Sequence, residues 1–199
     1  MDPCSNHLRL LTNQGFQHVI LDVSDKCTQQ VMELAKDESL LLDVTINIVR
    51  GDYEGLKGAI KFHSYLEIIF SGLNPVIDRI THITINKVTS QIGLLCMDIL
   101  HTSILEFLGR RIIPLSLVNY NGKQLLSYLD DELLKNTHGI TLWADIFSLE
   151  AIQFVVKRAT SLKSLTIEYT QSLLPEYKNC LEKIKSPSGI QVDFRYILR

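Results

Sequence analysis

The chain has 199 residues, of which 46% are hydrophobic and 21% charged, and its formal net charge is −2. This length and composition predict one domain with a sizeable core and exclude extensive disorder. A sequence without a basic excess also argues against nucleic acid as the main partner, because a basic stripe is the usual signature of nucleic-acid binding.

The predicted elements alternate between helix and strand along the whole chain. The opening segment NHLRLLTNQG, which ends in Gly15, is expected to be a helix, so residues 1–16 are predicted to cap the array. Seven short runs typical of strands follow: HVILDV (18–23), DVTINIV (43–49), HITINKV (82–88), PLSLVNY (114–120), GITLWAD (139–145), SLTIEYT (164–170) and GIQVDFR (189–195).

These runs form an internal repeat. Their first inward positions are Val19, Val44, Ile83, Leu115, Ile140, Leu165 and Ile190, which are separated by 25, 39, 32, 25, 25 and 25 residues. Four of the six spacings are identical, so we predict a repeat of about 25 residues and seven βα units over residues 17–199.

The segments between the runs have helical periodicity. Apolar residues recur at i, i+3, i+4 and i+7 over residues 92–108 and in QLLSYLDDELL, with weaker versions in TQQVMELA, LEAIQFVVKRA and PEYKNCLEKI. One long helix is expected to break near Gly72-Leu-Asn-Pro75. Connections of this length return each strand parallel to the last.

The faces of the strands indicate the architecture. Between the two inward apolar positions of each run lie Ile20, Thr45, Thr84, Ser116, Thr141, Thr166 and Gln191, of which six are polar. One covered face and one wet face predict an α/β fold of the leucine-rich-repeat-like solenoid type, a curved parallel sheet with helices on one face. The alternative is a doubly wound sheet, whose strands are usually apolar on both faces.

Signatures of catalysis and of metal binding are missing from the sequence. It has no Gly-rich nucleotide loop, no GxSxG and no HExxH, and its six histidines lack ligand spacing. The four cysteines (Cys4, Cys27, Cys96 and Cys180) are far apart, which predicts reduced, mostly buried thiols. We expect a non-enzyme without metal or cofactor. Without a signal peptide or a membrane span, it is expected in the cytoplasm or nucleus.

The open face carries the candidate binding site. Trp143, the single tryptophan, falls at an outward strand position, and we expect Val118 and Glu168 at the matching positions of the adjacent strands. Exposed aromatic residues often anchor protein interfaces; the alternative is that Trp143 packs under a loop. The predicted site consists of Trp143, Val118, Glu168, Tyr120, Asp145, Thr141, Thr166 and Asp193.

Charge and edge exposure indicate the partner. Asp22, Asp145, Glu168 and Asp193 make the predicted outward face acidic, with Arg195 as an exception, which favours a protein partner with a basic surface. The stretch IQVDFRYILR is expected to be a strand without a covering helix, and such an edge favours a dimer or an added partner strand.

The stretches LKSLTIEYTQSLLPEYKNCL and IIPLSLVNYNGKQLLSYLDDELLKNTHGITL resemble the F-box-associated, FTH-type repeat domains of nematodes, over about residues 80–199. The resemblance implies leucine-rich-repeat-like units that hold a target for a ubiquitin ligase. The segment before Gln17 is too short for an F-box, and the asparagine ladder of ordinary leucine-rich repeats is not expected.

The predicted function is therefore a non-catalytic protein–protein interaction module, a substrate-recognition or adaptor part of a ubiquitin-ligase-type or regulatory complex. The alternatives are a doubly wound enzyme or nucleotide-binding protein, and an RNA-associated adaptor.

Overall fold

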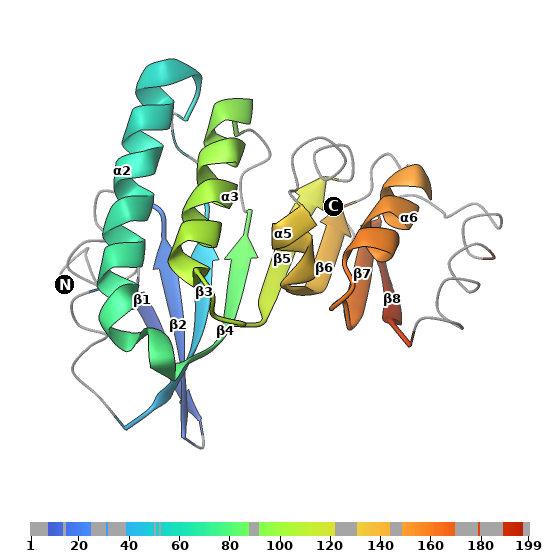
Figure 1. The fold of residues 1–199 in the computed structure, drawn as a ribbon, viewed down its shortest axis with the longest axis horizontal. Coiled ribbons are helices and arrows are strands. Elements are labelled where there is room, and N and C mark those ends of the chain that lie inside the picture. Colours follow the sequence, from blue (N-terminus) through green and yellow to red (C-terminus); the bar gives the residue numbers. More distant parts are fainter. Residues whose placement is uncertain are drawn as a thin grey trace. The chain divides into compact units, whose positions relative to one another are not determined.

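A computed structural model describes residues 8–13, 15–24, 31, 39–49, 51, 53–87, 92–121, 131–143, 149–169, 179 and 189–196. The chain divides into two compact units, Met1–Pro114 and Leu115–Arg199. Both units combine parallel strands with helices, which confirms the α/β class (Figure 1).

The first unit is a four-stranded sheet with helices. Its elements are β1 (Leu8–Asn13), β2 (Phe16–Asp22), β3 (Leu41–Asn47), α2 (Gly55–Leu73), the 3-10 helix η3 (Asn74–Arg79), β4 (Ile80–Asn86) and α3 (Leu94–Leu108). Strands β2, β3 and β4 are parallel neighbours in chain order, and β1 is antiparallel to β2.

The helix expected over residues 1–16 is wrong, because Leu8–Asn13 is the strand β1. Asn13 lies opposite Phe16, so a two-residue connection that includes Gly15 joins β1 to β2. Gly15 has φ 89°, the positive value that tight hairpin turns require. A short apolar run does not separate helix from strand by periodicity, and here pairing with β2 decides for the strand.

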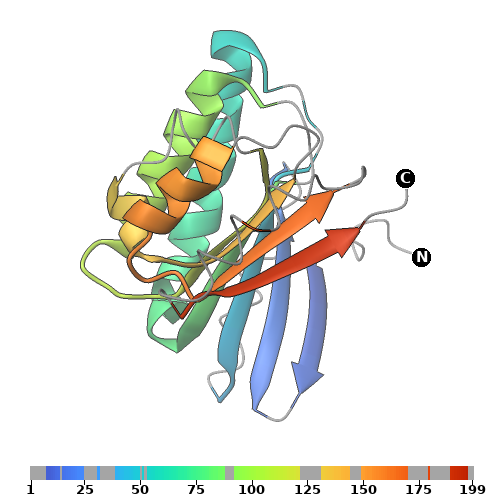
Figure 2. The same cartoon turned by 90° about the vertical axis from the view of Figure 1, so that its right-hand side faces the viewer.

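The core of the first unit lies between the sheet and two helices. Figure 2 shows α2 and α3 on one face of β2–β4. Inward side chains of these strands are buried, while those between them are half-buried, which confirms the predicted alternation. The buried set comprises Val19, Leu21, Leu42, Val44, Ile46, Ile83 and Ile85.

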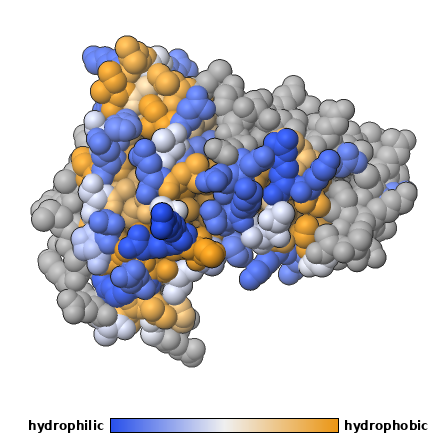
Figure 3. All heavy atoms as spheres, in the orientation of Figure 1, coloured by the Kyte–Doolittle hydropathy of each residue, from blue (hydrophilic) through white to orange (hydrophobic). Residues whose placement is uncertain are grey.

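Helix α2 ends where the sequence predicts a break. It stops at Leu73, and η3 follows with Pro75 in its first turn, where a missing N–H costs nothing. Gly72 is required for packing, because a Cβ there would lie 1.7 Å from Cγ1 of Val31. At the other end of α2, Leu56 and Ile60 are exposed, and Figure 3 shows hydrophobic atoms gathered on the surface at this end of the helix.

The second unit repeats the same plan. Its elements are β5 (Leu115–Asn121), α5 (Asp131–Lys135), β6 (Thr137–Trp143), α6 (Leu149–Arg158), β7 (Ser164–Tyr169) and β8 (Gln191–Tyr196). The four strands are parallel neighbours in chain order. Helices α5 and α6 lie on one face of them in both views (Figures 1 and 2), and the strand residues on that face are buried from Leu115 to Val192.

Each of the seven predicted runs is a strand in the structure, from β2 to β8. Helices are present at three of the predicted segments, as α3, α5 and α6. The segments TQQVMELA and PEYKNCLEKI lie outside the described residues, apart from single positions in each.

Two predicted registers are wrong. Leu165 lies beside Val192 and not beside Ile190, so β8 is displaced by two residues from the 25-residue spacing. On β6, Trp143 lies beside Asn121 and not beside Val118. The displacement of β8 by two keeps every side chain on its face, so the apolar pattern does not determine that register. On β5, Leu117 lies beside Ile140, which is also a displacement by two, and the irregularity after Leu117 adds a third residue before Asn121.

Candidate functional site

The open face of the first unit carries polar side chains in rows across β2, β3 and β4. Counting from the strand starts, the rows are Phe16–Leu41, His18–Asp43–His82, Ile20–Thr45–Thr84 and Asp22–Asn47–Asn86. Apart from the exposed first row, all of these residues are half-buried. The rows place groups from three distant sequence segments side by side.

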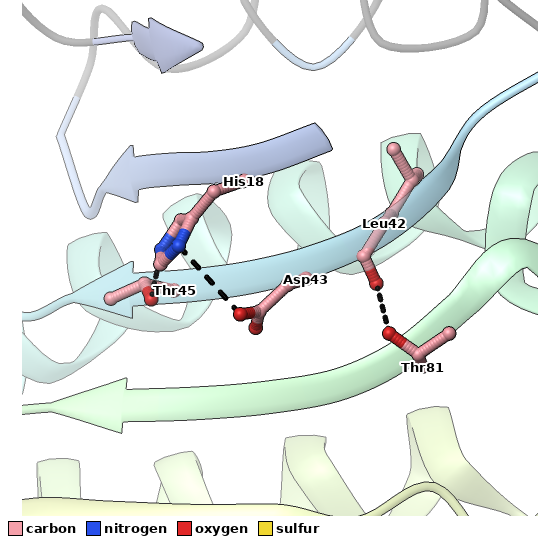
Figure 4. Close-up of polar contacts among 5 residues, drawn as sticks. All are labelled: His18, Leu42, Asp43, Thr45 and Thr81. Atoms are coloured by element: carbon pink, nitrogen blue, oxygen red, sulfur yellow. Dashed lines mark hydrogen bonds and ion pairs between the residues drawn. The ribbon is translucent and has the colours of Figure 1, made fainter. Parts of the chain in front are cut away.

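A β-bulge brings His82 into its row. The pairing of β3 with β4 shifts between Leu42 and Asp43, which leaves Thr81 as the extra residue. The hydroxyl of Thr81 donates to the carbonyl of Leu42 at 3.1 Å, so the bulge has a hydrogen bond of its own (Figure 4). Bulges re-aim the side chains that follow them, and here His82 comes to lie beside Asp43.

The imidazole of His18 lies between a hydroxyl and a carboxylate (Figure 4). Its Nε2 is 3.0 Å from Oγ1 of Thr45, and its Nδ1 is 3.6 Å from Oδ2 of Asp43. The three groups follow the order hydroxyl, imidazole, carboxylate. This order is the one that activates a nucleophilic hydroxyl in covalent catalysis.

The surroundings of Thr45 do not complete a catalytic site. Acyl transfer also requires N–H donors that stabilise an oxyanion. Strand β3 pairs with a neighbour on both sides, so its backbone N–H groups are used within the sheet. The 3.6 Å separation of His18 from Asp43 exceeds a hydrogen bond. We therefore interpret this cluster as a polar contact that fixes three side chains on an open surface.

The last row is a side-chain ladder. The amide of Asn86 donates from Nδ2 to Oδ1 of Asn47 at 3.0 Å, and Nδ2 of Asn47 donates to Oδ1 of Asp22 at 3.0 Å. This ladder lies at an outward position of the strands, and it was not predicted from the sequence. Its signal is present in the sequence, because Asp22, Asn47 and Asn86 occupy the same outward position of three runs.

An exposed apolar pair borders the polar rows. Phe16 and Leu41 lie side by side at the start of β2 and β3, and their exposed fractions are 46% and 42%. Both belong to the same face as His18 and Asp43. An aromatic residue next to polar groups is a favoured anchor in interfaces. Sequence reasoning missed this pair because the predicted strand began at His18.

The residues predicted as the binding site lie on the second unit. Val118, Thr141, Glu168 and Asp193 are half-buried. Thr166 is 8% exposed, so it contributes less to the open surface than expected. Asp145 and the side chains of Trp143 and Tyr120 lie outside the described part of the chain.

The observed registers separate the members of the predicted site. Trp143 has Glu168 on one side, as expected, but Asn121 on the other. The pairing of β5 with β6 shifts after Leu117, where Asn119 takes φ 62°. Val118 falls within that irregularity.

Charges on the second unit also differ from the prediction. Glu168 lies beside Arg195, not beside Asp193 as the repeat spacing indicated. Asp193 lies beside Thr166. The outward face of β7 and β8 therefore alternates in charge and is less acidic than the prediction.

Gly139 allows two serines to approach each other across β6. A Cβ at Gly139 would lie 2.7 Å from Oγ of Ser116 and 3.1 Å from Oγ of Ser164. The register places the three residues in one row of the open face. A side chain at this position would displace one of the serine hydroxyls.

Two buried groups have perturbed pKa values. Lys87, just after β4, is 3% exposed, and burial lowers its pKa from 10.5 to about 8. Burial raises the pKa of the Cys96 thiol, which donates to the carbonyl of Tyr53 at 3.0 Å. A thiol with a raised pKa is a poor nucleophile, so Cys96 is a structural residue, as expected.

Within the described residues there is no group of three or more His, Cys, Asp or Glu side chains placed to hold a metal ion. In that same part of the chain, none of the helices has the length and apolar character needed to cross a membrane.

Comparisons with family models, with curated proteins and with solved structures found no match to this chain.

Proposed function

We propose that this chain is a non-catalytic protein-binding module, a leucine-rich-repeat-like solenoid of βα units whose open sheet face receives a protein partner. Strand order supports the solenoid, because parallel neighbours follow chain order within each unit. Right-handed crossovers between such neighbours place the helices on one face, whereas a doubly wound sheet reverses its order at a switch point. The strands described within each unit show no reversal.

The observation that carries the binding function is the set of linked polar rows on β2–β4. His18 contacts Thr45, and Asn47 is hydrogen-bonded on both sides. Side chains fixed before binding lose little conformational entropy when a partner arrives. Such a surface suits recognition, and the exposed pair Phe16–Leu41 beside it supplies apolar area for an anchor.

The charges of this face favour a partner with basic side chains. Asp22 and Asp43 lie on it, and the outward positions of β2, β3 and β4 contain no lysine or arginine. The register places one basic residue on this face, Arg9 of β1 beside Ile20, so the acidic part of the face is the part on β2 and β3. A partner that places a basic residue near Asp43 and an apolar residue over Phe16 is complementary to both features.

The cellular role follows from the resemblance to F-box-associated repeats. In that role the module recognises a substrate, or acts as an adaptor, in a ubiquitin-ligase-type or regulatory complex of the cytoplasm or nucleus. The strands around Trp143 form a second, separate candidate surface on the second unit.

The experiment compares two matched variants. Thr84→Arg places a long cation in the middle of the open face, whereas Thr102→Arg places the same side chain on the exposed side of α3. Immobilised wild-type and variant proteins are incubated with an extract of the source organism, and bound proteins are quantified by mass spectrometry. We expect partners retained by the wild type and by Thr102→Arg to be depleted at least about tenfold by Thr84→Arg, because a cation on this face repels a basic partner.

Equal retention by all three proteins would contradict the open-face proposal, provided that Thr84→Arg melts within a few degrees of the wild type. A thermal-shift screen addresses the alternatives. Stabilisation by nucleotides would favour a nucleotide-binding protein, and salt-dependent binding of RNA would favour an RNA adaptor.

A further inference from the structure

The edge of the second unit is formed by β8. Among the described strands, β8 has β7 as its neighbour on one side (Figure 2). The N–H of Gln191 donates to the carbonyl of Lys163 at 2.9 Å, so the backbone of Gln191 points toward β7. Successive residues of a strand point their backbone groups to opposite sides. The N–H and C=O groups of Val192, Phe194 and Tyr196 therefore point to the edge.

The side chains of β8 also divide into two sets. On the helix side, burial decreases along the strand, from Val192 at 5% exposed to a half-buried Phe194 and Tyr196 at 56%. On the open side lie Asp193, which is half-buried, and Arg195, which is exposed. Asp193 and Arg195 carry opposite charges and lie two residues apart, next to an apolar stripe. When two copies of β8 run in opposite directions, each of these charges can lie opposite a charge of the other sign.

We propose that two copies of this chain associate through β8, which pairs antiparallel with β8 of the second copy about a two-fold axis at Phe194. In this register Phe194 of one copy lies opposite Phe194 of the other, and Val192 lies opposite Tyr196. The backbone groups of Phe194 point to the edge, so the pair of phenylalanines at the axis exchanges two hydrogen bonds. The pairing follows the general tendency of open edges to add a strand.

The charges select this register among those that the backbone allows. Residues whose backbone groups point to the edge must pair with one another. The two-fold axis can therefore pass through a residue of β8 but not between two residues. An axis at Asp193 places two aspartates opposite each other, and an axis at Arg195 places two arginines opposite each other. The axis at Phe194 places Asp193 opposite Arg195 twice. Like charges directly opposite destabilise a strand pair, whereas opposite charges stabilise it.

The apolar side chains agree with the same register. Phe194 and Tyr196 lie on the helix side, where burial is incomplete in a single copy. Pairing at Phe194 stacks the two phenylalanines across the axis and covers Tyr196 with Val192 of the second copy. Cross-strand aromatic and β-branched pairs of this kind stabilise sheets, and the two-fold symmetry closes the assembly as a dimer.

Charge reversal tests the register directly. Asp193→Arg alone gives two cations at each cross-strand pair, and Arg195→Asp alone gives two anions. Each variant is expected to weaken dimerisation at least about tenfold, since two attractive pairs become repulsive. The control is Asp98→Arg, which reverses the same charge on the exposed side of α3, and it is expected to dimerise like the wild type.

Mixing the two variants distinguishes the register from a loss of folding. A heterodimer of Asp193→Arg with Arg195→Asp restores opposite charges at both pairs, and so does the homodimer of the double variant. Sedimentation velocity measures the result as the appearance of a species of twice 22.7 kDa.

We expect a wild-type dimer, weakened association of each single variant and a restored dimer in the mixture. A wild type that stays monomeric at its highest soluble concentration would overturn the proposal. A dimer insensitive to both reversals would do the same, and so would a mixture that does not associate. None of these outcomes depends on whether the open face binds a protein.

Discussion

Replacement of Lys87 by methionine is expected to stabilise the protein at neutral pH. Lys87 follows β4 in the inward alternation of Ile83 and Ile85, and 3% of it is exposed. Burial lowers its pKa from 10.5 to about 8 because the charged form loses its hydration. Methionine has a similar length and no charge, so it fills the same space without that cost.

The pKa gives the size of the effect. The difference between 10.5 and about 8, at 1.36 kcal/mol per pKa unit, corresponds to about 3 kcal/mol by which the buried charge weakens the folded state. Lys87 also makes a polar or electrostatic interaction, which methionine loses. The expected gain of Lys87→Met in the free energy of unfolding at pH 7 is therefore about 1–3 kcal/mol.

The pH dependence of stability has a definite sign. The pKa of Lys87 is lower in the folded protein than in the unfolded chain. Below pH 8, Lys87 is therefore protonated in both, and its buried charge has its full destabilising effect. Between about pH 8 and 10.5 the unfolded chain binds more protons at this position, so stability rises with pH across that window. The raised pKa of Cys96 has the opposite effect at alkaline pH, but the wild type and the variant share it.

Urea denaturation followed by circular dichroism measures both quantities. Wild type, Lys87→Met and the control Lys57→Met, which changes an exposed lysine of α2, are compared from pH 7 to pH 10.5. The difference in the free energy of unfolding between wild type and Lys87→Met should become smaller as the pH rises, while the control Lys57→Met should follow the wild type. A variant that is less stable than the wild type at pH 7, or a gap independent of pH, would refute the reasoning.

Two further substitutions test the packing and the open face. Gly72→Ala should lower the free energy of unfolding by about 1–3 kcal/mol, because the new methyl group overlaps Val31. The double variant Gly72→Ala/Val31→Ala should be less destabilised than the sum of its single changes, and simple additivity in denaturation would argue against this contact. Asn47→Ala removes one donated and one accepted hydrogen bond, and should cost about 1–2 kcal/mol. The exposed Asn74→Ala serves as its control, and an equal loss in both variants would show that the ladder adds no stability.

Much of the local structure could be predicted from the sequence. Strict alternation of apolar and polar residues identified the seven parallel strands, because the period of two is a property of the strand itself. The break of α2 before Pro75 was also predictable, since proline stops a helix by its own geometry. Each of these signals is local, because it depends only on residues that are close to one another in the sequence.

The candidate site could be predicted only in part. That the outward positions carry polar groups was evident from Thr45 and Thr84. Which groups are neighbours was predictable for β2–β4, because Val19, Val44 and Ile83 align as the first inward positions of their runs and lie side by side in the structure. The same alignment places His82 beside Asp43, whereas the bulge at Thr81 that precedes this row was not predictable. A bulge adds one residue to one strand, and the local sequence around Thr81 does not signal it.

The sequence by itself determined which strand residues face the core and which face outward, because alternation along a strand is a local property. Only the tertiary structure decided that residues 8–13 pair with β2 as a strand, that Trp143 lies beside Asn121, and that Glu168 lies beside Arg195. A short apolar run fits helix and strand equally, and a two-residue displacement, as between β7 and β8, leaves the buried face of a strand unchanged. Between β5 and β6 such a displacement combines with the irregularity after Leu117, so the partner of Trp143 is three residues from the expected one. In each case contacts between distant segments select the final arrangement.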